Sequence, residues 1–526
     1  MRNDAPRRRF VGGLLGMGAA VPALAAQSGA AAPKGIINVR DRGATGDGKR
    51  FDTKAIQDAM DACSASGGGT VYVPPGTYLT GTLVLKSRVN LHLETGAVLL
   101  GSKDLKDYRT IVSKLRSYVD NYTEKSLIYG EDLEDVALTG RGTIDGQGAS
   151  YAGPYKVRPY MLRIVNSRGV AIQDVTFKDS AMWVQHYQGC DDVNIDGVTV
   201  HSRANRNNDG IDIDGCRRVR IANCEITCID DAIVLKSTFD RVCRDVVITN
   251  CVLSTDCNAL KLGTESNGGF ENIAISNCTV YDTRLAGIAL EMVDGGVLDR
   301  VTVSNVAMNG VGAPIFVRLG DRGRPFVEGG PRPAAGKLRN AIISNVQAVN
   351  AGPAGCVISG LPEHAIENLT LENIRLEFAG GGKKAAGPVP EKPDGYPEFR
   401  MFGPVPAYGF YCRHVKNLRM RNIETRCAKP DERPALYCDD VEGLELSSAG
   451  LDAGAETGTA VEFQGVRDAL IQGCRVPARI PTFLRVGGAA SANIALLAND
   501  LGKARQAVEV AGDAPKDAVF QQGNRV

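Results

Sequence analysis

Short runs of alternating apolar and polar residues recur along the chain, and several of them end in an asparagine. Three of these runs, Val219–Asn223, Val246–Asn250 and Ile273–Asn277, are spaced so that the asparagine returns every 27 residues. Runs of related pattern end at other spacings, at Asp174, Gly197, Asn305, Asn345, Asn373 and Asn422. Alternation of period two next to turn residues predicts short β-strands, and repetition at a fixed interval of this length predicts a solenoid. We therefore expect an all-β solenoid from about residue 35 to near the C-terminus.

Residues that occupy the same place in successive coils would lie about 4.8 Å apart along the solenoid axis. The asparagines could then hydrogen-bond one above another as a ladder, and we expect the turn groups that they pair to be buried. Cys224, Cys251 and Cys278 each follow one of these asparagines, which favours an interior stack of free thiols that behave as small hydrophobic side chains. Disulfide bonds are the alternative, because the chain has 14 cysteines and carries the export pattern described below.

One helix is predicted, from about Thr53 to Cys63. Asp52 or Thr53 can cap its N-terminus, and an apolar stripe follows at Ala55, Ile56, Ala59 and Met60. A solenoid needs a cap at its open end, and this helix is placed to provide one.

A loop insertion is predicted at about residues 380–406, where glycine, proline and lysine are frequent. It carries Tyr396, Phe399 and Phe402 in a chain with only 6% aromatic residues. The insertion could overhang a sugar site, or its rings could pin it to the solenoid.

Residues 1–26 have the pattern of an export signal. Arg7-Arg8-Arg9 precedes an apolar, uncharged run that begins at Gly12, and Ala23-Leu24-Ala25 is a candidate cleavage site. The pattern resembles a twin-arginine signal peptide, and the alternative is a short membrane anchor. We expect a periplasmic or secreted protein with no membrane segment after signal removal.

The charge balance narrows the class of partner. Lys and Arg number 61 against 60 Asp and Glu, a formal net charge of +1. This balance disfavours a protein that binds nucleic acid or coats an anionic membrane. A neutral or small partner is favoured, and we expect a monomer.

The candidate chemistry is concentrated in three aspartates. Asp209 lies in Asn207-Asn-Asp-Gly, and Asp230-Asp231 follows 21 residues later, so neighbouring coils would place Asp209 beside Asp231. Three carboxylates on one face repel one another, and at least one should have a raised pKa, as a general acid requires. A calcium site, which also uses clustered carboxylates, is the alternative.

These motifs resemble glycoside hydrolase family 28, the polygalacturonase family. The resemblance rests on Gly43–Gln57, Gly140–Gly148, Ala181–His186 and the two aspartate motifs, which occur in the family's order. It implies a single-stranded, right-handed parallel β-helix over residues 35–526 that hydrolyses glycosidic bonds of pectic polysaccharides or oligosaccharides with inversion, using neither metal nor cofactor. By the same resemblance, Asp230 is the acid, and Asp209 and Asp231 activate the water.

The chain also departs from the family pattern. Asn258 stands where the family has a histidine, and Ala289-Leu290-Glu291 stands where it has Arg-Ile-Lys, which binds substrate carboxylates. Either the sugar at that position is neutral, or its acid is held by another cation such as Lys236, Lys261, Arg284 or Arg318. We therefore expect plain polygalacturonate to be a poor substrate. If the aromatic cluster from Tyr396 to Tyr411 folds over one end of the groove, it would favour an exo mode of cleavage. The candidate substrate-binding residues are Asn207, Trp183, His186, Lys236, Asn258, Lys261, Glu291 and Arg318.

Lys236 has a second interpretation, as an ion-pair partner of Asp214 one coil away. Two other functions also stay open for the whole chain: a polysaccharide lyase on the same fold, and a catalytically silent carbohydrate-binding or adhesin protein. A lyase would require a basic residue that abstracts a proton, and the three ordered aspartates argue against it. Their retention also argues against a silent protein.

Overall fold

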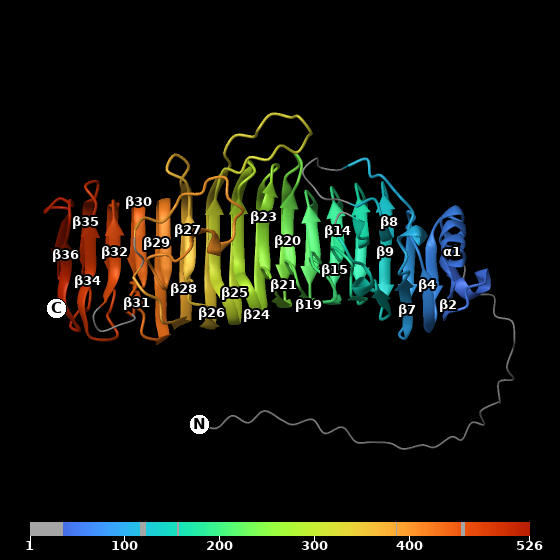
Figure 1. Ribbon diagram of the computed structural model, residues 1–526, viewed down its shortest axis with the longest axis horizontal. Coiled ribbons are helices and arrows are strands. Elements are labelled where there is room, and N and C mark those ends of the chain that lie inside the picture. Colours follow the sequence, from blue (N-terminus) through green and yellow to red (C-terminus); the bar gives the residue numbers. More distant parts are fainter. Residues whose placement is uncertain (1–34, 116–122, 155–156, 385–386, 454–457) are drawn as a thin grey trace, which may run out of the picture.

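The computed structural model describes residues 35–526 except 116–122, 155–156, 385–386 and 454–457. It is all-β, as predicted, and its strands pair in parallel to form three ladders. Figure 1 shows the resulting elongated stack, with the N-terminal strands at one end and the C-terminal strands at the other. The predicted signal at residues 1–26 lies outside the described residues. Within them, no helix is long and apolar enough to cross a membrane.

The first ladder carries the outward-facing polar residues considered below. It comprises β5 (Leu83–Val84), β8 (Ser126–Glu131), β11 (Tyr160–Val165), β14 (Gln185–Gln188), β17 (Ile211–Asp214), β20 (Ile233–Ser237), β23 (Leu260–Ser266), β27 (Cys356–Ser359), β32 (Thr459–Gln464), β34 (Ile480–Gly487) and β36 (Ala504–Val510).

The second and third ladders form the other sides of the stack. The second comprises β1 (Ile36–Asn38), β3 (Gly69–Val73), β6 (Val89–Leu93), β9 (Glu134–Gly140), β12 (Arg168–Gln173), β15 (Asp191–Asp196), β18 (Arg217–Ala222), β21 (Cys243–Thr249), β33 (Arg467–Gln472), β35 (Ala492–Leu497) and β37 (Val519–Gln522). The third comprises β2 (Asp47–Phe51), β4 (Gly76–Thr80), β7 (Ala97–Gly101), β10 (Thr143–Asp145), β13 (Thr176–Lys178), β16 (Thr199–Ser202), β19 (Glu225–Cys228), β22 (Val252–Thr255) and β31 (Gly450–Leu451).

Six long strands pass through more than one ladder. They are β24 (Phe270–Met292), β25 (Val297–Leu319), β26 (Lys337–Ala351), β28 (Ile366–Gly380), β29 (Phe410–Lys429) and β30 (Leu436–Ser447). The described residues also include the α-helix α1 (Thr53–Ala65) and the 3-10 turns η1 (Val39–Arg42), η2 (Leu105–Asp107), η3 (Gly148–Ser150) and η5 (Phe399–Phe402).

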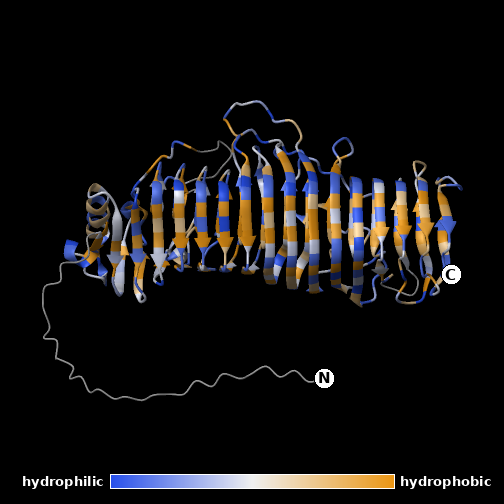
Figure 2. Cartoon of the chain, turned by 180° about the vertical axis from the view of Figure 1, so that it is seen from behind, coloured by the Kyte–Doolittle hydropathy of each residue, from blue (hydrophilic) through white to orange (hydrophobic). Residues whose placement is uncertain are grey.

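The core lies inside the stack and runs along its whole length. On β20, Ile233 and Leu235 belong to this core, whereas the intervening Val234 does not, because successive side chains of a strand point to opposite faces. Figure 2 shows hydrophobic and hydrophilic bands that alternate along the strands and recur from one coil to the next. The period-two pattern of the sequence therefore marks which side chains face inward.

The predicted asparagine ladder is present. Nδ2 of Asn250 donates to Oδ1 of Asn223 at 3.3 Å. Nδ2 of Asn277 donates to Oγ1 of Thr249 instead of to Asn250, at 3.4 Å, and the asparagine pairs resume from Asn305 to Asn277 at 3.0 Å and from Asn345 to Asn305 at 2.9 Å. These side chains are exposed, not buried as we expected. Each asparagine also has a positive φ near 55°, a conformation that asparagine adopts more readily than most residues. The ladder therefore stabilises turns at the surface.

The cysteines confirm the expectation of an interior stack. All 14 are free thiols, and Cys224, Cys251 and Cys278 are each at most 2% exposed. Their thiols therefore act as small core side chains.

Helix α1 packs through Ile56, Ala59, Met60 and Cys63 at the N-terminal end of the stack (Figure 1). Asp52 occupies the N-cap position but makes no side-chain capping bond. Its carboxylate accepts hydrogen bonds from the backbone N–H groups of Thr45 and Gly46 instead, at 2.7 and 3.0 Å. In place of the predicted capping contact, the Asp52 side chain therefore makes hydrogen bonds that stabilise the preceding turn.

The insertion at about 380–406 divides its aromatic residues between two roles. Phe399 and Phe402 are buried in an apolar cluster with Ala289, Phe316 and other outward-facing residues of the first ladder, whereas Tyr396 is 55% exposed. The two phenylalanines pin the insertion to the stack, and Tyr396 projects from it.

Candidate active site

The three aspartates come together at the start of neighbouring strands of the first ladder. Asp209 lies two residues before β17, and Asp230 and Asp231 lie just before β20. The backbone N–H of Gly210 donates to the carbonyl of Asp231 at 2.9 Å. This contact confirms the predicted register of Asp209 beside Asp231 on adjacent coils.

Asp231 is held by groups from the next coil. Its Oδ1 accepts from the backbone N–H of Asn258 at 3.1 Å and from Nδ2 of that residue at 2.9 Å. Its Oδ2 lies 2.8 Å from Nζ of Lys261. Oδ1 of Asn258 in turn accepts from the N–H of Ala286 at 3.1 Å, so the amide bridges two coils. Asn258 and Lys261 thus position Asp231.

Lys236 lies between two carboxylates. Its Nζ is 3.2 Å from Asp209 Oδ2 and 2.9 Å from Asp212 Oδ1. Our alternative pairing with Asp214 is wrong, because Asp214 accepts from the N–H and Oγ1 of Thr238 and contacts His186 instead. Sequence reasoning missed Asp212. Its signal was the alternation Asp212-Ile-Asp214, which directs both carboxylates outward from β17.

Asp230 is only half-buried and has fewer charged contacts. Nδ2 of Asn207 donates to its Oδ2 at 3.4 Å, and Oδ1 of Asn207 accepts from Nη2 of Arg158 at 2.8 Å. Arg158 therefore fixes the orientation of the Asn207 amide, and was not among the predicted residues.

The surroundings push the pKa values of these carboxyl groups apart. Burial and the charge of Asp231 raise the pKa of Asp230. Burial also opposes ionisation of Asp231, but the charge of Lys261 and its hydrogen bond outweigh burial, so the pKa of Asp231 is lowered. Burial and the charge of Asp212 raise the pKa of Asp209. Burial raises the pKa of Asp212 to about 7, although Lys236 opposes this rise.

Trp183 and His186 lie beside Lys236. Nζ of Lys236 is 3.6 Å from the centroid of the half-buried Trp183 ring, a cation–π contact. His186 is fully buried, stacks on Tyr160 with ring centroids 5.7 Å apart, and contacts Asp214 at 3.5 Å. Burial lowers its pKa to about 4. His186 therefore supports the site from behind and does not line it, contrary to our expectation.

Two further predicted substrate-binding residues do not line an open site. Arg318 is fully buried, and its Nη2 donates to the carbonyls of Glu391 and Lys392 in the insertion, at 3.0 and 3.1 Å. Glu291 is also fully buried, 3.6 Å from Nζ of Lys261, and burial raises its pKa to about 8. Neither side chain reaches an open surface, because the insertion covers this end of the first ladder.

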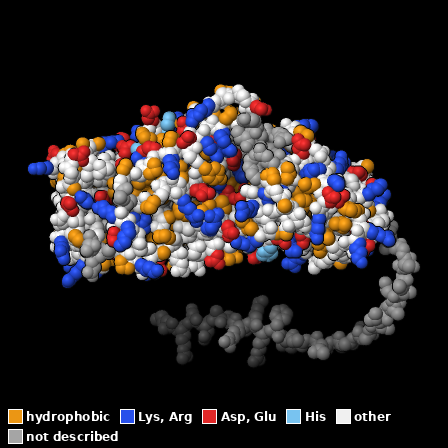
Figure 3. All heavy atoms as spheres, in the orientation of Figure 1, with side chains coloured by type: hydrophobic (Ala, Val, Ile, Leu, Met, Phe, Trp, Pro, Cys, Tyr) orange, Lys and Arg blue, Asp and Glu red, His pale blue; other side chains and the backbone are white. Residues whose placement is uncertain are grey.

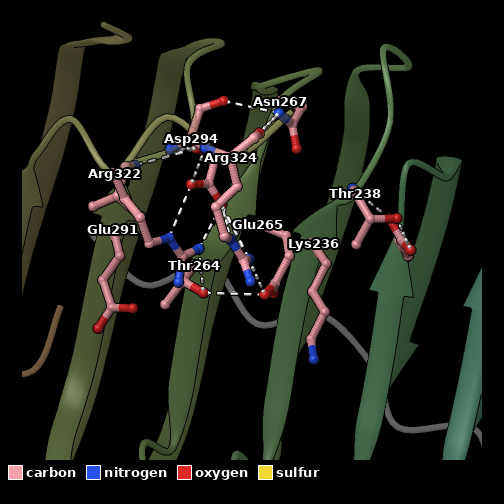
Figure 4. A network of polar contacts seen from close by, with 12 residues as sticks. Lys236, Thr238, Thr264, Glu265, Asn267, Glu291, Asp294, Arg322 and Arg324 are labelled. Carbon is pink, nitrogen blue, oxygen red and sulfur yellow. Dashed lines mark hydrogen bonds and ion pairs between the residues drawn. The ribbon is translucent and has the colours of Figure 1, made fainter. Parts of the chain in front are cut away.

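Sequence reasoning also missed an arginine pair on the loop after β25. Arg322 and Arg324 both bind the buried carboxylate of Asp294, and Nη2 of Arg324 lies 2.7 Å from Glu265. Figure 4 shows the charged ends of the two arginines, Glu265 and Lys236 near one another. The available signal was Asp321-Arg-Gly-Arg-Pro, a pair of arginines directly after a strand.

Figure 3 shows this face of the molecule, which is hollowed near the middle of its long axis, with acidic and basic side chains around the hollow. The calcium alternative is less well supported here, because Lys236 already contacts both Asp209 and Asp212, and Lys261 already contacts Asp231. Among the described residues, Asp230, Asp231 and Cys257 are the group with ligand atoms close enough to share an ion. A thiol is a poor ligand for calcium, which takes oxygen ligands.

The profile described as "Glycosyl hydrolases family 28" matches residues 63–390. The chain belongs to this family.

Curated relatives match over shorter regions. A "Probable polygalacturonase" of Vitis vinifera is 37% identical over 218 residues, which are 38% of this chain and 44% of the relative. "Plasmin and fibronectin-binding protein A" of Streptococcus pneumoniae is 38% identical over 29% of this chain and 21% of its own length. An "Exo-poly-alpha-D-galacturonosidase" of Dickeya chrysanthemi is 40% identical over 22% of this chain and 20% of its own length. The chain thus spans less than half the length of each of these relatives.

A solved structure supports the fold. The crystal structure of a hyperthermoactive exopolygalacturonase from Thermotoga maritima matches with a TM-score of 0.61 and 20% identity, over 75% of this chain and 92% of that one. At this identity the likeness concerns the fold alone.

Proposed function

We propose that this family 28 protein is a polygalacturonase-like hydrolase that cleaves glycosidic bonds of pectic polysaccharides or oligosaccharides. The observation that supports this most strongly is the pair Asp230 and Asp231, two adjacent carboxyl groups whose pKa values are shifted in opposite directions. A site that keeps one carboxyl protonated and its neighbour ionised is suited to acid–base catalysis near neutral pH. The names of the relatives supply the pectic substrate class.

Each carboxyl group has a distinct role in this proposal. Asp230, with its raised pKa, protonates the oxygen of the departing sugar. Asp231, held ionised by Lys261, accepts a proton from the attacking water, and Asp209 orients that water from the neighbouring coil. Lys236 balances the charge of Asp209 and Asp212, so that the two buried carboxyl groups can lie side by side.

Inversion is also part of the proposal. One oxygen of Asp230 and one of Asp231 lie within 4.8 Å of each other, which is closer than the roughly 6.5–9.5 Å typical of the two carboxyl groups in inverting enzymes. Inversion is therefore supported by family membership and not by this distance. The anomeric form of the first product decides the outcome.

The insertion supports cleavage from a chain end. Phe399 and Phe402 cover Ala289 and Phe316 on the first ladder, directly beyond β23, which carries Lys261. A pectic chain lying along this ladder would meet the insertion there, so the groove is closed on that side of the aspartates. Closure next to the catalytic groups favours release of short products.

The finer description of the fold belongs to the same proposal. We infer one hydrolase domain over residues 35–526 that winds as a right-handed parallel β-helix, with α1 as its N-terminal cap. The right hand follows from the strong preference of parallel crossover connections. The proposal also includes export by the twin-arginine signal at residues 1–26. The protein would then act as a monomer in the cell envelope or outside the cell.

A carbohydrate-binding or adhesin function is the second candidate, favoured by the match to the plasmin- and fibronectin-binding protein. The test incubates wild type and Asp230→Asn with pectic oligosaccharides and follows reducing ends, ultraviolet absorbance and the anomeric proton signals of the product. We expect reducing ends without absorbance, an inverted first product and loss of turnover in Asp230→Asn. Absorbance would indicate a lyase, and binding without products would indicate a binder.

A further inference from the structure

The strand that carries the family's carboxylate-binding residues cannot serve that purpose in this chain. Ala289 has no polar side chain and is buried under the insertion. Glu291 is also buried, and neither of its carboxyl oxygens has a hydrogen-bond partner among the described residues. Three of the four cations that sequence analysis offered instead are also committed, whereas the fourth, Arg284, is exposed. Lys236 and Lys261 are paired with aspartates, and Arg318 binds the insertion backbone.

Arg322 and Arg324 are held from behind by one buried carboxylate. Asp294 is fully buried. Its Oδ1 accepts from Nε of Arg322 at 2.9 Å and from the backbone N–H of Arg324 at 3.1 Å, and its Oδ2 accepts from Nε of Arg324 at 3.2 Å. Nη2 of each arginine also binds Asp294. Asp294 balances one of the two guanidinium charges and Glu265, 2.7 Å from Arg324, balances the other, so the cluster offers oriented N–H donors without a net charge.

Part of each guanidinium stays available to a ligand. The hydrogen bonds of Arg322 and Arg324 use Nε and Nη2, and neither Nη1 has a hydrogen-bond partner or is buried within the described part of the chain. The Arg322 and Arg324 side chains are 11% and 30% exposed. Figure 4 shows their charged ends on the same side as those of Glu291 and Lys236. The pair therefore presents oriented donors to the site.

Tyr396 connects this pair to the aspartates. Its ring centroid is 5.6 Å from Cζ of Arg322 and 5.9 Å from Nζ of Lys261, and Lys261 holds Asp231. The ring is the exposed aromatic of the insertion that closes the groove. A sugar next to the cleavage point and against the closed end would thus have Tyr396 on one side and the arginines at its edge.

We propose that Arg322 and Arg324 bind the carboxylate of a uronic acid residue at the closed end of the groove, with Tyr396 as the wall against which that sugar lies. The proposal rests on the function proposed above and names the groups that give it an acidic substrate. Planar guanidinium groups match a carboxylate in shape as well as charge. Glu265, ionised and bound to Arg324, is placed to accept hydrogen bonds from hydroxyl groups of the same sugar.

The test compares kcat/KM on an oligogalacturonide with that on the same oligosaccharide after its carboxyl groups have been reduced to alcohols. The variants are Arg322→Gln and Arg324→Gln, with Arg332→Gln as the control. Arg332 lies on the same loop, is 53% exposed and pairs with Asp321. We expect the wild type and Arg332→Gln to prefer the acidic substrate by about tenfold or more, the scale of one lost charge-assisted contact. We expect Arg322→Gln and Arg324→Gln to lose most of this preference by losing activity on the acid alone.

An equal loss on both substrates, or an unchanged preference in Arg324→Gln, would overturn the proposal. So would a wild type that prefers the reduced, neutral oligosaccharide. A binding measurement separates this result from a failure of the proposed function. Galacturonic acid should raise the melting temperature of Asp230→Asn but not that of Asp230→Asn/Arg324→Gln. Stabilisation that needs Arg324 in a protein without hydrolase activity would support the site and reject the reaction.

Discussion

Nζ of Lys261 lies 2.8 Å from Oδ2 of Asp231, and both side chains are at most 5% exposed. This ion pair is what distinguishes Asp231 from Asp230, because burial alone would raise the pKa of both carboxyl groups. The same ammonium also lies 3.6 Å from Glu291. Of the groups that lower the pKa of Asp231, this buried cation contributes most.

Replacing Lys261 with methionine should shift the pH dependence of activity upward. Without the ammonium, burial dominates and the pKa of Asp231 rises, so the base is protonated over more of the acidic range. Lys261 also lowers the pKa of Asp230, so in the variant the alkaline limb of the pH–activity profile should move to higher pH as well. We expect roughly a 10- to 100-fold loss of kcat/KM on the acidic side.

Lys261→Arg should retain the wild-type pH profile better than Lys261→Met does, and Lys54→Met, at an exposed position, should match the wild type. Unshifted limbs in Lys261→Met would mean that the ion pair does not tune the site.

Removing each proposed catalytic carboxyl should reduce turnover by at least roughly 10²-fold. The effect on stability should differ among Asp209→Asn, Asp230→Asn and Asp231→Asn. The first two relieve repulsion between neighbouring carboxyl groups, so their melting temperatures should equal or exceed that of the wild type. The third leaves Lys261 without its closest partner and should melt lower. Asp240→Asn, at an exposed position, is the control for both measurements. Ordinary turnover in Asp230→Asn would remove the mechanism.

These aspartates and the strand ladders could be predicted because each depends on local spacing. The period of the repeats fixes which residues stack, and it predicts that Asp209 lies beside Asp231. The roles of Arg318 and Glu291 could not be obtained in this way. Both are buried by an insertion whose start lies 60 or more residues further along the chain, and no periodicity specifies where such a loop docks.

The arginine pair was missed for a related reason. Arg322 and Arg324 lie on a loop outside the repeat, so their register with the aspartates is not defined by coil length. Contacts with Asp294, two residues after β24, and with Thr264 and Glu265 on β23 bring them to the site. The exposure of the asparagine ladder was mispredicted because the pattern identifies a turn without showing which side of it faces solvent.

The asparagine ladder should stabilise the folded protein through the backbone conformation of its residues as well as through their side-chain hydrogen bonds. Asn250 has φ of 56° and an exposed side chain. Asn250→Ala should lower the free energy of unfolding by roughly 1–2 kcal/mol, because alanine is strained in this conformation and the side-chain hydrogen bond is lost. Asn250→Gly loses the side-chain hydrogen bond but adopts a positive φ without strain, so it should lower the free energy of unfolding by less. Urea unfolding of both variants measures the difference. Equal costs would show that the positive φ does not matter.

Stability should fall as the pH decreases from about 6.5 to about 4 because of His186. Its pKa is lowered to about 4 in the folded protein from an ordinary value of 6.5, so the unfolded chain binds its proton first. The resulting contribution is present above pH 6.5 and lost as pH falls toward the folded pKa, and it amounts to roughly 3 kcal/mol at most. His186→Phe keeps a ring against Tyr160 and should make unfolding less dependent on pH in this window. His201→Gln, at an exposed position, should not. Identical pH dependence in wild type and His186→Phe would contradict the assignment.

Restoring the family residues at positions 289 and 291 should destabilise the protein. Ala289 is buried against the insertion cluster, so Ala289→Arg places an unpaired charge among apolar side chains. Glu291→Lys places a second ammonium beside Lys261. Each change buries an uncompensated charge, at a cost of roughly 3–5 kcal/mol. We therefore expect Ala289→Arg/Glu291→Lys to melt at a lower temperature than the wild type, to be cleaved more readily by protease within about residues 380–406, and to show no gain in activity on polygalacturonate.

Ala274→Arg, at an exposed position of the same strand, is the matched control and should behave as wild type. A double variant as stable as the wild type and more active on polygalacturonate would show instead that this strand faces an open groove.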